Sequence, residues 1–177
     1  MKIGVIGAES SGKSTLCRQL SEQYGYIWIK EYARTYVEAL RRPYTRADLN
    51  AIAAHLSGQI TADYGNNVVL FDTEMIIMKV WYEHVYGSVP PLVEQTLRNA
   101  PMDDYLLLAP DLPAEPDAVR ENLDKREYFY AWYERELQAL GVPYTIIRGT
   151  GNERTQAARQ AIQQALSAHH APHTTKQ

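Results

Sequence analysis

The feature that most constrains this chain is an eight-residue stretch near its N-terminus, GAESSGKS at residues 7–14, which follows the apolar run IGVI at residues 3–6. Its two glycines allow the backbone to turn so tightly that successive N–H groups point inward at a polyphosphate, and a helix beginning near Lys13 adds the positive end of its dipole. The stretch therefore predicts a phosphate-binding loop between a strand and a helix. A plain glycine-rich turn is the alternative, but it has no need of Gly-Lys-Ser at the helix start.

The expected ligand of this loop is ATP with Mg²⁺. With this spacing Lys13 reaches the β- and γ-phosphates and acts in catalysis, while the Ser14 hydroxyl binds the metal. Glu9, inside the loop, either lines the acceptor side or faces water. The residues expected to contact ATP are Gly7, Glu9, Ser10, Ser11, Gly12, Lys13, Ser14 and Thr15.

The composition is that of one globular domain. The chain has 177 residues, of which 45% are apolar and 22% charged, so it can bury a substantial core. We expect one domain over residues 1–168 and a flexible tail over residues 169–177. The three histidines of this tail are expected to belong to a frayed polar end, with a metal ligand set as the alternative. They are His169, His170 and His173.

Charge, cysteine content and hydropathy argue against several other classes. A net charge of −3 argues against nonspecific binding to nucleic acid. No apolar run approaches the length of about 20 residues that spans a bilayer. The N-terminus has neither a basic leader nor an apolar signal core, and the single cysteine, Cys17, excludes an intramolecular disulfide. We therefore expect a cytoplasmic protein without membrane or nucleic-acid partners; the sequence does not indicate its oligomeric state.

Strand and helix signals alternate along the chain. Short apolar runs predict five strands, at residues 2–6, 26–29, 68–71, 105–109 and 144–147. Periodicity and end signals predict helices at residues 13–24, from about 30–34 to 42, from the capping box at 45–48, at 75–86, 92–99 and 127–140, and after residue 152. This alternation predicts an α/β fold of the P-loop NTPase type. Its parallel sheet has about five strands, is flanked by helices and binds ligands outside the carboxyl ends of the strands.

Two acids stand at such strand ends. Asp72 ends the strand expected beside the phosphate-loop strand, where it holds Mg²⁺ through water or orients the acceptor hydroxyl; the alternative is that Asp72 or Thr73 caps the next helix. Glu31 ends the second strand and is a candidate base for the acceptor's proton, although a helix N-terminus also favours acids. Arg34, one turn later, either binds the substrate or pairs with Glu31.

A lid is predicted between Asp111 and Arg126, where the chain is polar and carries two prolines. Phosphoryl transfer needs mobile cations that stabilise the charge of the transition state. We therefore expect Arg120 and Arg126 to close over the phosphates. The alternative is a solvated charge run.

Aromatic residues follow Asp72 at helical spacing. Trp81 and Tyr82, with Tyr86, are expected to stack on a flat heterocyclic substrate, although core packing explains the same spacing equally well.

Four motifs, taken together, resemble the ribosylnicotinamide kinase domain of NadR-type bacterial NAD-biosynthesis proteins. They are GAESSGKSTL at residues 7–16, EYAR at 31–34, FDTE at 71–74 and DLPAEPDAVR at 111–120, and the similarity runs in order from residue 2 to about 166. The resemblance implies a nucleoside-kinase-like P-loop fold. It also implies that ATP phosphorylates the ribose 5′-hydroxyl of nicotinamide riboside to give nicotinamide mononucleotide, with Asn152 and Arg154 touching the adenine. The alternative for Arg154 is a first-turn surface residue.

Two departures from the family pattern concern the lid, where Ala114 and Ala118 stand in place of an expected Trp and Gly. A chain of this length is also expected to carry the kinase step alone, without the adenylyltransferase or DNA-binding parts of larger relatives. A kinase for another nucleoside or small metabolite remains a second hypothesis, and an ATP-dependent switch without a metabolite substrate a third. An acceptor pocket with its own acid distinguishes a kinase from a switch.

Overall fold

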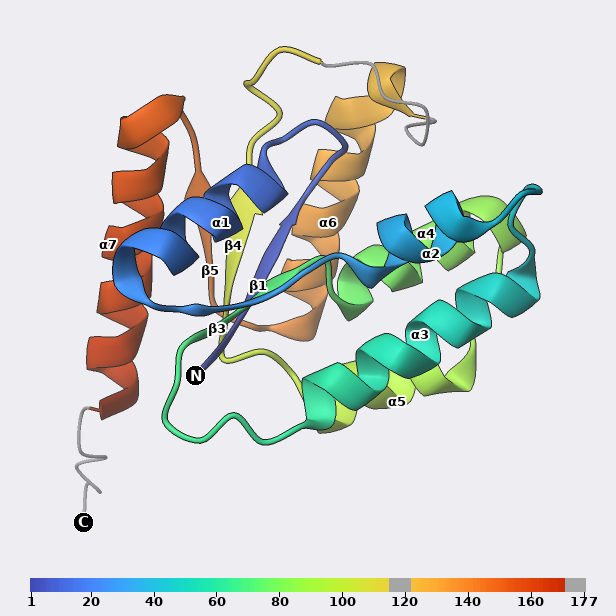
Figure 1. Cartoon of the computed structure of the whole chain (residues 1–177), viewed down its shortest axis with the longest axis horizontal. Helices are drawn as coiled ribbons and strands as arrows, with labels where there is room; N and C mark the ends of the chain where they lie inside the picture. Colours follow the sequence, from blue (N-terminus) through green and yellow to red (C-terminus); the bar gives the residue numbers. More distant parts are fainter. Residues whose placement is uncertain (115–121, 171–177) are drawn as a thin grey trace.

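A computed structural model describes residues 1–114 and 122–170 of the chain. Its centre is a parallel sheet of five strands (Figure 1). The strands are β1 (Lys2–Gly7), β2 (Ile27–Ile29), β3 (Val69–Asp72), β4 (Asp104–Leu108) and β5 (Tyr144–Ile147), in the spatial order β2-β3-β1-β4-β5. The predicted fold class is confirmed, and each predicted strand is present with ends within one residue of the prediction.

Seven α-helices and one 3-10 turn connect the strands in the described part of the chain. They are α1 (Lys13–Tyr24), α2 (Tyr32–Ala39), α3 (Arg46–Thr61), α4 (Met75–Tyr86), α5 (Pro91–Asn99), η1 (Leu123–Lys125), α6 (Arg126–Leu140) and α7 (Gly151–His170). None of the helices described is long and apolar enough to cross a membrane.

One predicted helix end is wrong. Helix α2 stops at Ala39 rather than at Arg42, because the residue before Pro43 is disfavoured in the α conformation and Leu40 is already extended, with ψ 132°. Helix α7 continues to His170, two residues into the predicted tail, and residues 171–177 lie outside the described chain.

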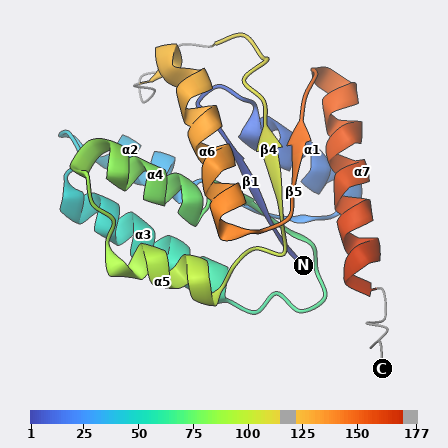
Figure 2. The ribbon, with the colours of Figure 1, turned by 180° about the vertical axis from the view of Figure 1, so that it is seen from behind.

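The helices cover both faces of the sheet (Figures 1 and 2). Alternating strand residues such as Ile3 and Val5 pack with α1 and α7 on one face. Ile6 and Phe71 point to the other face, where α3, α4 and α6 contribute to a larger apolar cluster. Gly4 lies under the Tyr105 ring, and a Cβ added there would approach that ring to 2.5 Å, so the strand needs a glycine at this point.

The strand order determines where chemistry can take place. Strand β1 is the central strand, and its carboxyl end opens into the phosphate loop. Strand β3 runs beside it with Val5 opposite Asp72, which confirms that this acid follows the neighbouring strand. Because all strands are parallel, every acid or glycine at a carboxyl end lies on one edge of the sheet.

Candidate active site

The phosphate loop is held in a tight turn. Gly12 caps α1 with φ 82°, a left-handed conformation, and a Cβ there would lie 2.8 Å from Leu112. Ser10 has φ 58°, which is uncommon for a residue with a side chain and characteristic of functional turns. The ammonium group of Lys13 donates to the carbonyl oxygens of Gly7 at 2.9 Å and Ala8 at 3.2 Å. The lysine therefore lies across the hollow that the loop encloses.

A cavity of about 400 Å³ begins at this loop and extends toward α2 and α3. Its phosphate end is lined by all eight residues predicted to contact ATP, Gly7 and residues 9–15. Its other end combines charged and aromatic side chains, among them Glu31, Arg34, Arg42, Tyr44, Trp81 and Phe129. The volume is that of a typical small-molecule site.

Asp72 does not line the cavity, whereas the next residue, Thr73, does. The carboxylate is 1% exposed, and neither oxygen has a hydrogen-bond partner in the described chain. Burial raises its pKa, although Ser14, Lys13 and Trp28 favour the charged form. A buried carboxylate without a partner, next to the Ser14 hydroxyl, fits a hydrated Mg²⁺ ion. Both roles expected of Asp72 stay predictions, and its proximity to Ser14 supports metal binding through water.

The capping alternative for Asp72 and Thr73 is wrong, because Glu74 caps α4 instead. The Oε1 atom of Glu74 accepts a hydrogen bond from the amide of Ile76 at 2.7 Å, and Oε2 accepts one from the Tyr105 hydroxyl at 3.3 Å. Thr73 has φ 79°, which turns the chain sharply between the two acids. Sequence analysis treated Glu74 only as part of a motif, since no local pattern showed that it is fully buried.

Glu74 gives a prediction for the pH dependence of stability. Burial raises the pKa of Glu74 from 4.5 to about 8, so between these values the folded protein holds a proton that the unfolded chain has released. Its contribution to the free energy of unfolding is therefore present below about pH 4.5 and is lost as pH rises to about 8. We expect Glu74→Gln to remove this loss. Urea denaturation of both proteins from about pH 5 to about pH 8 measures the difference, and parallel pH profiles would contradict the assignment.

Glu31 and Arg34 both line the cavity. Glu31 occupies the N-cap position of α2, but its side chain makes no capping hydrogen bond. Burial raises its pKa, an effect partly opposed by Lys13, and this is the setting of a general base. Arg34 lies 3.7 Å from Glu38, one turn further along α2, and also lowers the pKa of Glu31.

Stacking of Trp81 on a substrate stays a prediction, while for Tyr82 the alternative of core packing holds. Trp81 lines the cavity, whereas the Tyr82 side chain is fully buried and its hydroxyl donates to Asn50 Oδ1 at 2.7 Å. Successive residues on a helix point about 100° apart, and at this turn of α4 Tyr82 points into the core. Phe129 and Tyr133 of α6 complete the wall. Sequence analysis missed both as site residues, because helical spacing does not distinguish a cavity wall from a core.

For Arg154 the surface alternative is wrong, and its contact with the adenine stays a prediction. It is 4% exposed, so it is no surface residue. Its guanidinium donates to Asp111 Oδ1 and to three backbone oxygens. Those oxygens belong to Ser11 (2.8 Å), Ala109 (3.1 Å) and Gly149 (2.8 Å). Arg154 thus braces the phosphate loop against the ends of β4 and β5, and its terminal nitrogens donate to protein acceptors.

Both ends of the predicted lid contact the phosphate loop, the N-terminal end through the Pro113 carbonyl oxygen, which accepts a hydrogen bond from the Ser10 hydroxyl at 3.5 Å. Arg126 donates to the carbonyl oxygens of Leu112 at 2.8 Å and Ser10 at 3.3 Å, and the amide of Asn122 donates to Glu9 Oε2 at 3.0 Å. The catalytic role of Arg126 stays a prediction. Arg120 and Ala118 belong to residues 115–121, outside the described chain, so their roles also stay predictions.

The chain is similar in sequence to known nucleotide-binding proteins. Residues 2–154 match the family described as "AAA domain". The chain is 25% identical over 135 residues to the trifunctional NAD biosynthesis/regulator protein NadR of Escherichia coli K12, covering 71% of the chain and 33% of that protein. It is 32% identical over 97 residues to the cytidylate kinase of Streptococcus uberis, covering 50% of the chain and 42% of the relative.

Two solved structures share the fold. A NadR protein in complex with NR superposes with TM-score 0.80 and 22% identity, covering 94% of the chain and 51% of the other. Deoxyadenosine kinase from M. mycoides superposes with TM-score 0.64 and 15% identity, covering 93% of the chain and all of the other. The resemblance drawn from the four motifs is therefore confirmed, while the chain spans only about a third of the length of the NadR relative from E. coli.

Proposed function

The chain belongs to the AAA domain family, which matches residues 2–154, and on that premise we propose that it is an ATP-dependent kinase for the ribose 5′-hydroxyl of nicotinamide riboside. The product would be nicotinamide mononucleotide. The observation that carries the proposal is a single cavity with a phosphate-binding loop at one end and an acid, arginines and aromatic rings at the other. Resemblance to NadR proteins supplies the identity of the acceptor.

Different residues bind the two substrates, ATP and the acceptor. The loop amides and Lys13 bind the β- and γ-phosphates of ATP. Ser14, together with Asp72 through water, would hold Mg²⁺, which neutralises charge on the phosphates. Glu31 takes the proton from the acceptor hydroxyl, and Trp81 lies against the flat ring of the acceptor. Because these reactants are held by one rigid sheet edge, positioning supplies much of the rate enhancement.

The third hypothesis, an ATP-dependent switch, is less well supported. A switch needs loops that sense the γ-phosphate, but it does not need a partly buried acid at the acceptor end of the cavity, the position that Glu31 occupies here. Kinases for other nucleosides or nucleotides remain the competing class, given the similarity to a cytidylate kinase and a deoxyadenosine kinase. The cytoplasmic location belongs to the same proposal.

We expect nicotinamide riboside to be the preferred acceptor in a nucleoside panel with Mg-ATP. A cationic pyridinium ring over an aromatic face gains about 0.5–2 kcal/mol, which corresponds to roughly 2- to 30-fold in kcat/KM over neutral nucleosides. Mass spectrometry of the products with nicotinamide riboside, adenosine, uridine, cytidine and thymidine measures the preference.

Two outcomes of the panel would contradict the proposal in different ways. Equal or better kcat/KM with uridine, cytidine or thymidine would reject the acceptor but keep the kinase. ATP consumption without dependence on any acceptor would favour the switch. Parallel assays of Lys13→Ala protein exclude a contaminating kinase.

A further inference from the structure

The corner between α2 and α3, residues 40–45, forms part of the acceptor end of the cavity. Arg42, Pro43 and Tyr44 all line it, yet they belong to neither helix. Helix α2 has already ended at Ala39, so no continuous ladder of backbone hydrogen bonds fixes these residues. Their position must come from side-chain contacts.

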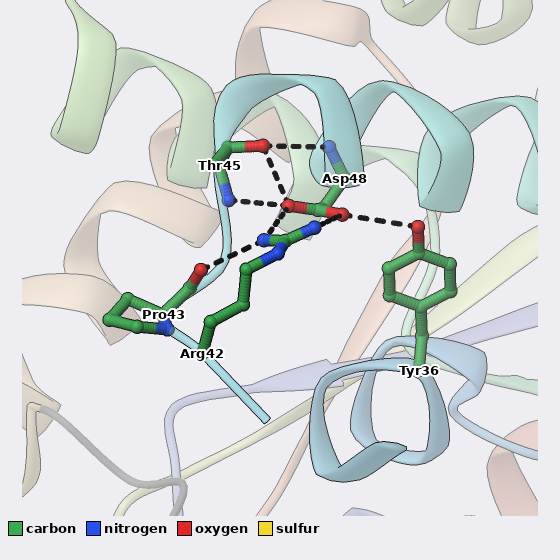
Figure 3. A network of polar contacts seen from close by, with 5 residues as sticks. All are labelled: Tyr36, Arg42, Pro43, Thr45 and Asp48. Carbon is green, nitrogen blue, oxygen red and sulfur yellow. Dashed lines mark hydrogen bonds and ion pairs between the residues drawn. The ribbon is translucent and has the colours of Figure 1, made fainter. Parts of the chain in front are cut away.

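Asp48, in the first turn of α3, provides those contacts (Figure 3). Arg42 donates to it through both terminal nitrogens, Nη1 to Oδ2 at 2.7 Å and Nη2 to Oδ1 at 2.9 Å. Such a two-point pair fixes orientation as well as distance. The same Nη1 also donates to the carbonyl oxygen of Pro43 at 2.9 Å, so the arginine holds the backbone of the corner directly.

The same carboxylate binds both neighbouring segments. Its Oδ2 accepts hydrogen bonds from the amide of Thr45 at 2.7 Å and from the Thr45 hydroxyl at 2.6 Å, while Oδ1 accepts one from the Tyr36 hydroxyl at 3.2 Å. Tyr36 comes from α2, so one buried group joins α2, the corner and α3. We name Tyr36, Arg42, Thr45 and Asp48 the corner latch. The sequence analysis identified only its capping box, Thr45 with Asp48.

Charge in the latch is balanced internally. Asp48 is only 5% exposed, and the hydrogen bonds from Arg42 and Thr45 hold its pKa well below the usual range. Arg42 lines the cavity, but both of its terminal nitrogens are engaged by Asp48. Although its side chain is 52% exposed, Arg42 thus holds both Asp48 and the Pro43 carbonyl.

We propose that the corner latch is a positioning device for the acceptor, fixing the Pro43–Tyr44 wall of the cavity and thereby setting acceptor affinity without affecting ATP. This inference rests on the proposed function for the identity of the acceptor. The two ends of the cavity are held independently: the phosphate loop is braced by Arg154, Arg126 and Asn122, none of which belongs to the latch. A loosened corner should therefore change only one of the two substrate affinities.

The test compares Arg42→Gln and Asp48→Asn with wild type and with Arg41→Ala. Arg41 is the exposed neighbour of Arg42 and does not line the cavity, so it controls for lost charge at the corner. In both latch variants we expect KM for nicotinamide riboside to rise about tenfold, as expected when a charge-assisted hydrogen bond is lost. KM for ATP and kcat at saturating acceptor should stay within about twofold, and Arg41→Ala should match wild type. Equal changes in the two KM values, or none, would overturn the proposal.

Calorimetric titration of nicotinamide riboside without ATP provides a second readout, with the same tenfold loss of affinity expected. Arg42→Gln retains the Thr45–Asp48 capping box, so α3 keeps its start even if Asp48→Asn fails to fold. Should wild type not act on nicotinamide riboside, the proposed function fails while the latch is tested by hydrogen exchange. The Thr45 amide donates to Asp48 Oδ2, which Arg42 no longer orients in Arg42→Gln, so this amide should exchange about tenfold faster than in wild type. Unchanged exchange would overturn the latch itself.

Discussion

Lys13→Ala is expected to lower kcat for phosphorylation of nicotinamide riboside by about a hundredfold or more while the protein stays folded. The ammonium group lies across the hollow of the loop, bonded to the carbonyl oxygens of Gly7 and Ala8, where the β- and γ-phosphates would bind. Charge moves between these phosphates as the bond breaks, so the lysine contributes most in the transition state. Steady-state kinetics with circular dichroism measures both activity and folding.

The matched control is Arg18→Ala, which removes a positive charge from the exposed face of the same helix. It should leave kcat within about twofold of wild type. If Lys13→Ala also stays within about twofold, the phosphate loop is not part of the mechanism, whichever acceptor is used.

Asp72→Asn is expected to lower kcat about a hundredfold and to raise the Mg²⁺ concentration needed for half-maximal rate. The same change should make the protein more stable at pH 8. Burial raises the pKa of Asp72, so its ionised form, which has no hydrogen-bond partner among the described residues, destabilises the fold above the usual carboxyl pKa. An amide carries no such charge, and the stability difference should disappear as pH falls toward about 4.

Asp104→Asn is the matched control, because it also removes the charge of a partly buried carboxylate. Asp104 begins β4, at the end of the sheet opposite the loop, and burial also raises its pKa. Its replacement should leave kcat and the Mg²⁺ dependence within about twofold. Unchanged kcat and unchanged Mg²⁺ dependence in Asp72→Asn would exclude a metal role for Asp72. A lower melting temperature of this variant at pH 8 would show that the ionised Asp72 does not destabilise the fold.

Much of the fold could be predicted because its signals are local. Apolar runs indicated the strands, and Gly25, Gly87 and Gly141 each cap a helix where the pattern ends. The capping box of Thr45 and Asp48 lies within four residues and is present in the structure. Only the end of α2 and the extent of α7 differ.

The site was predicted less completely, because its partners are far apart in the sequence. Trp81 and Tyr82 are equivalent in spacing, and only the packing of α4 decides that one lines the cavity while the other bonds to Asn50. The sequence indicates a surface residue or a base contact for Arg154. Its four hydrogen-bond acceptors, which lie between residues 11 and 149, are brought together only by the fold.

The sequence by itself determined the phosphate loop, the parallel α/β class and the acids at the strand ends. These depend on turn chemistry and on periods of 2 and 3.6 residues, which are readable within a short window. Tertiary structure alone decided that Glu74 is buried, that Arg154 braces the loop and that Arg42 pairs with Asp48 beside the cavity. The physical reason is that burial and hydrogen-bond partners of a charged side chain are set by the elements packed around it, and no local pattern specifies which elements those are.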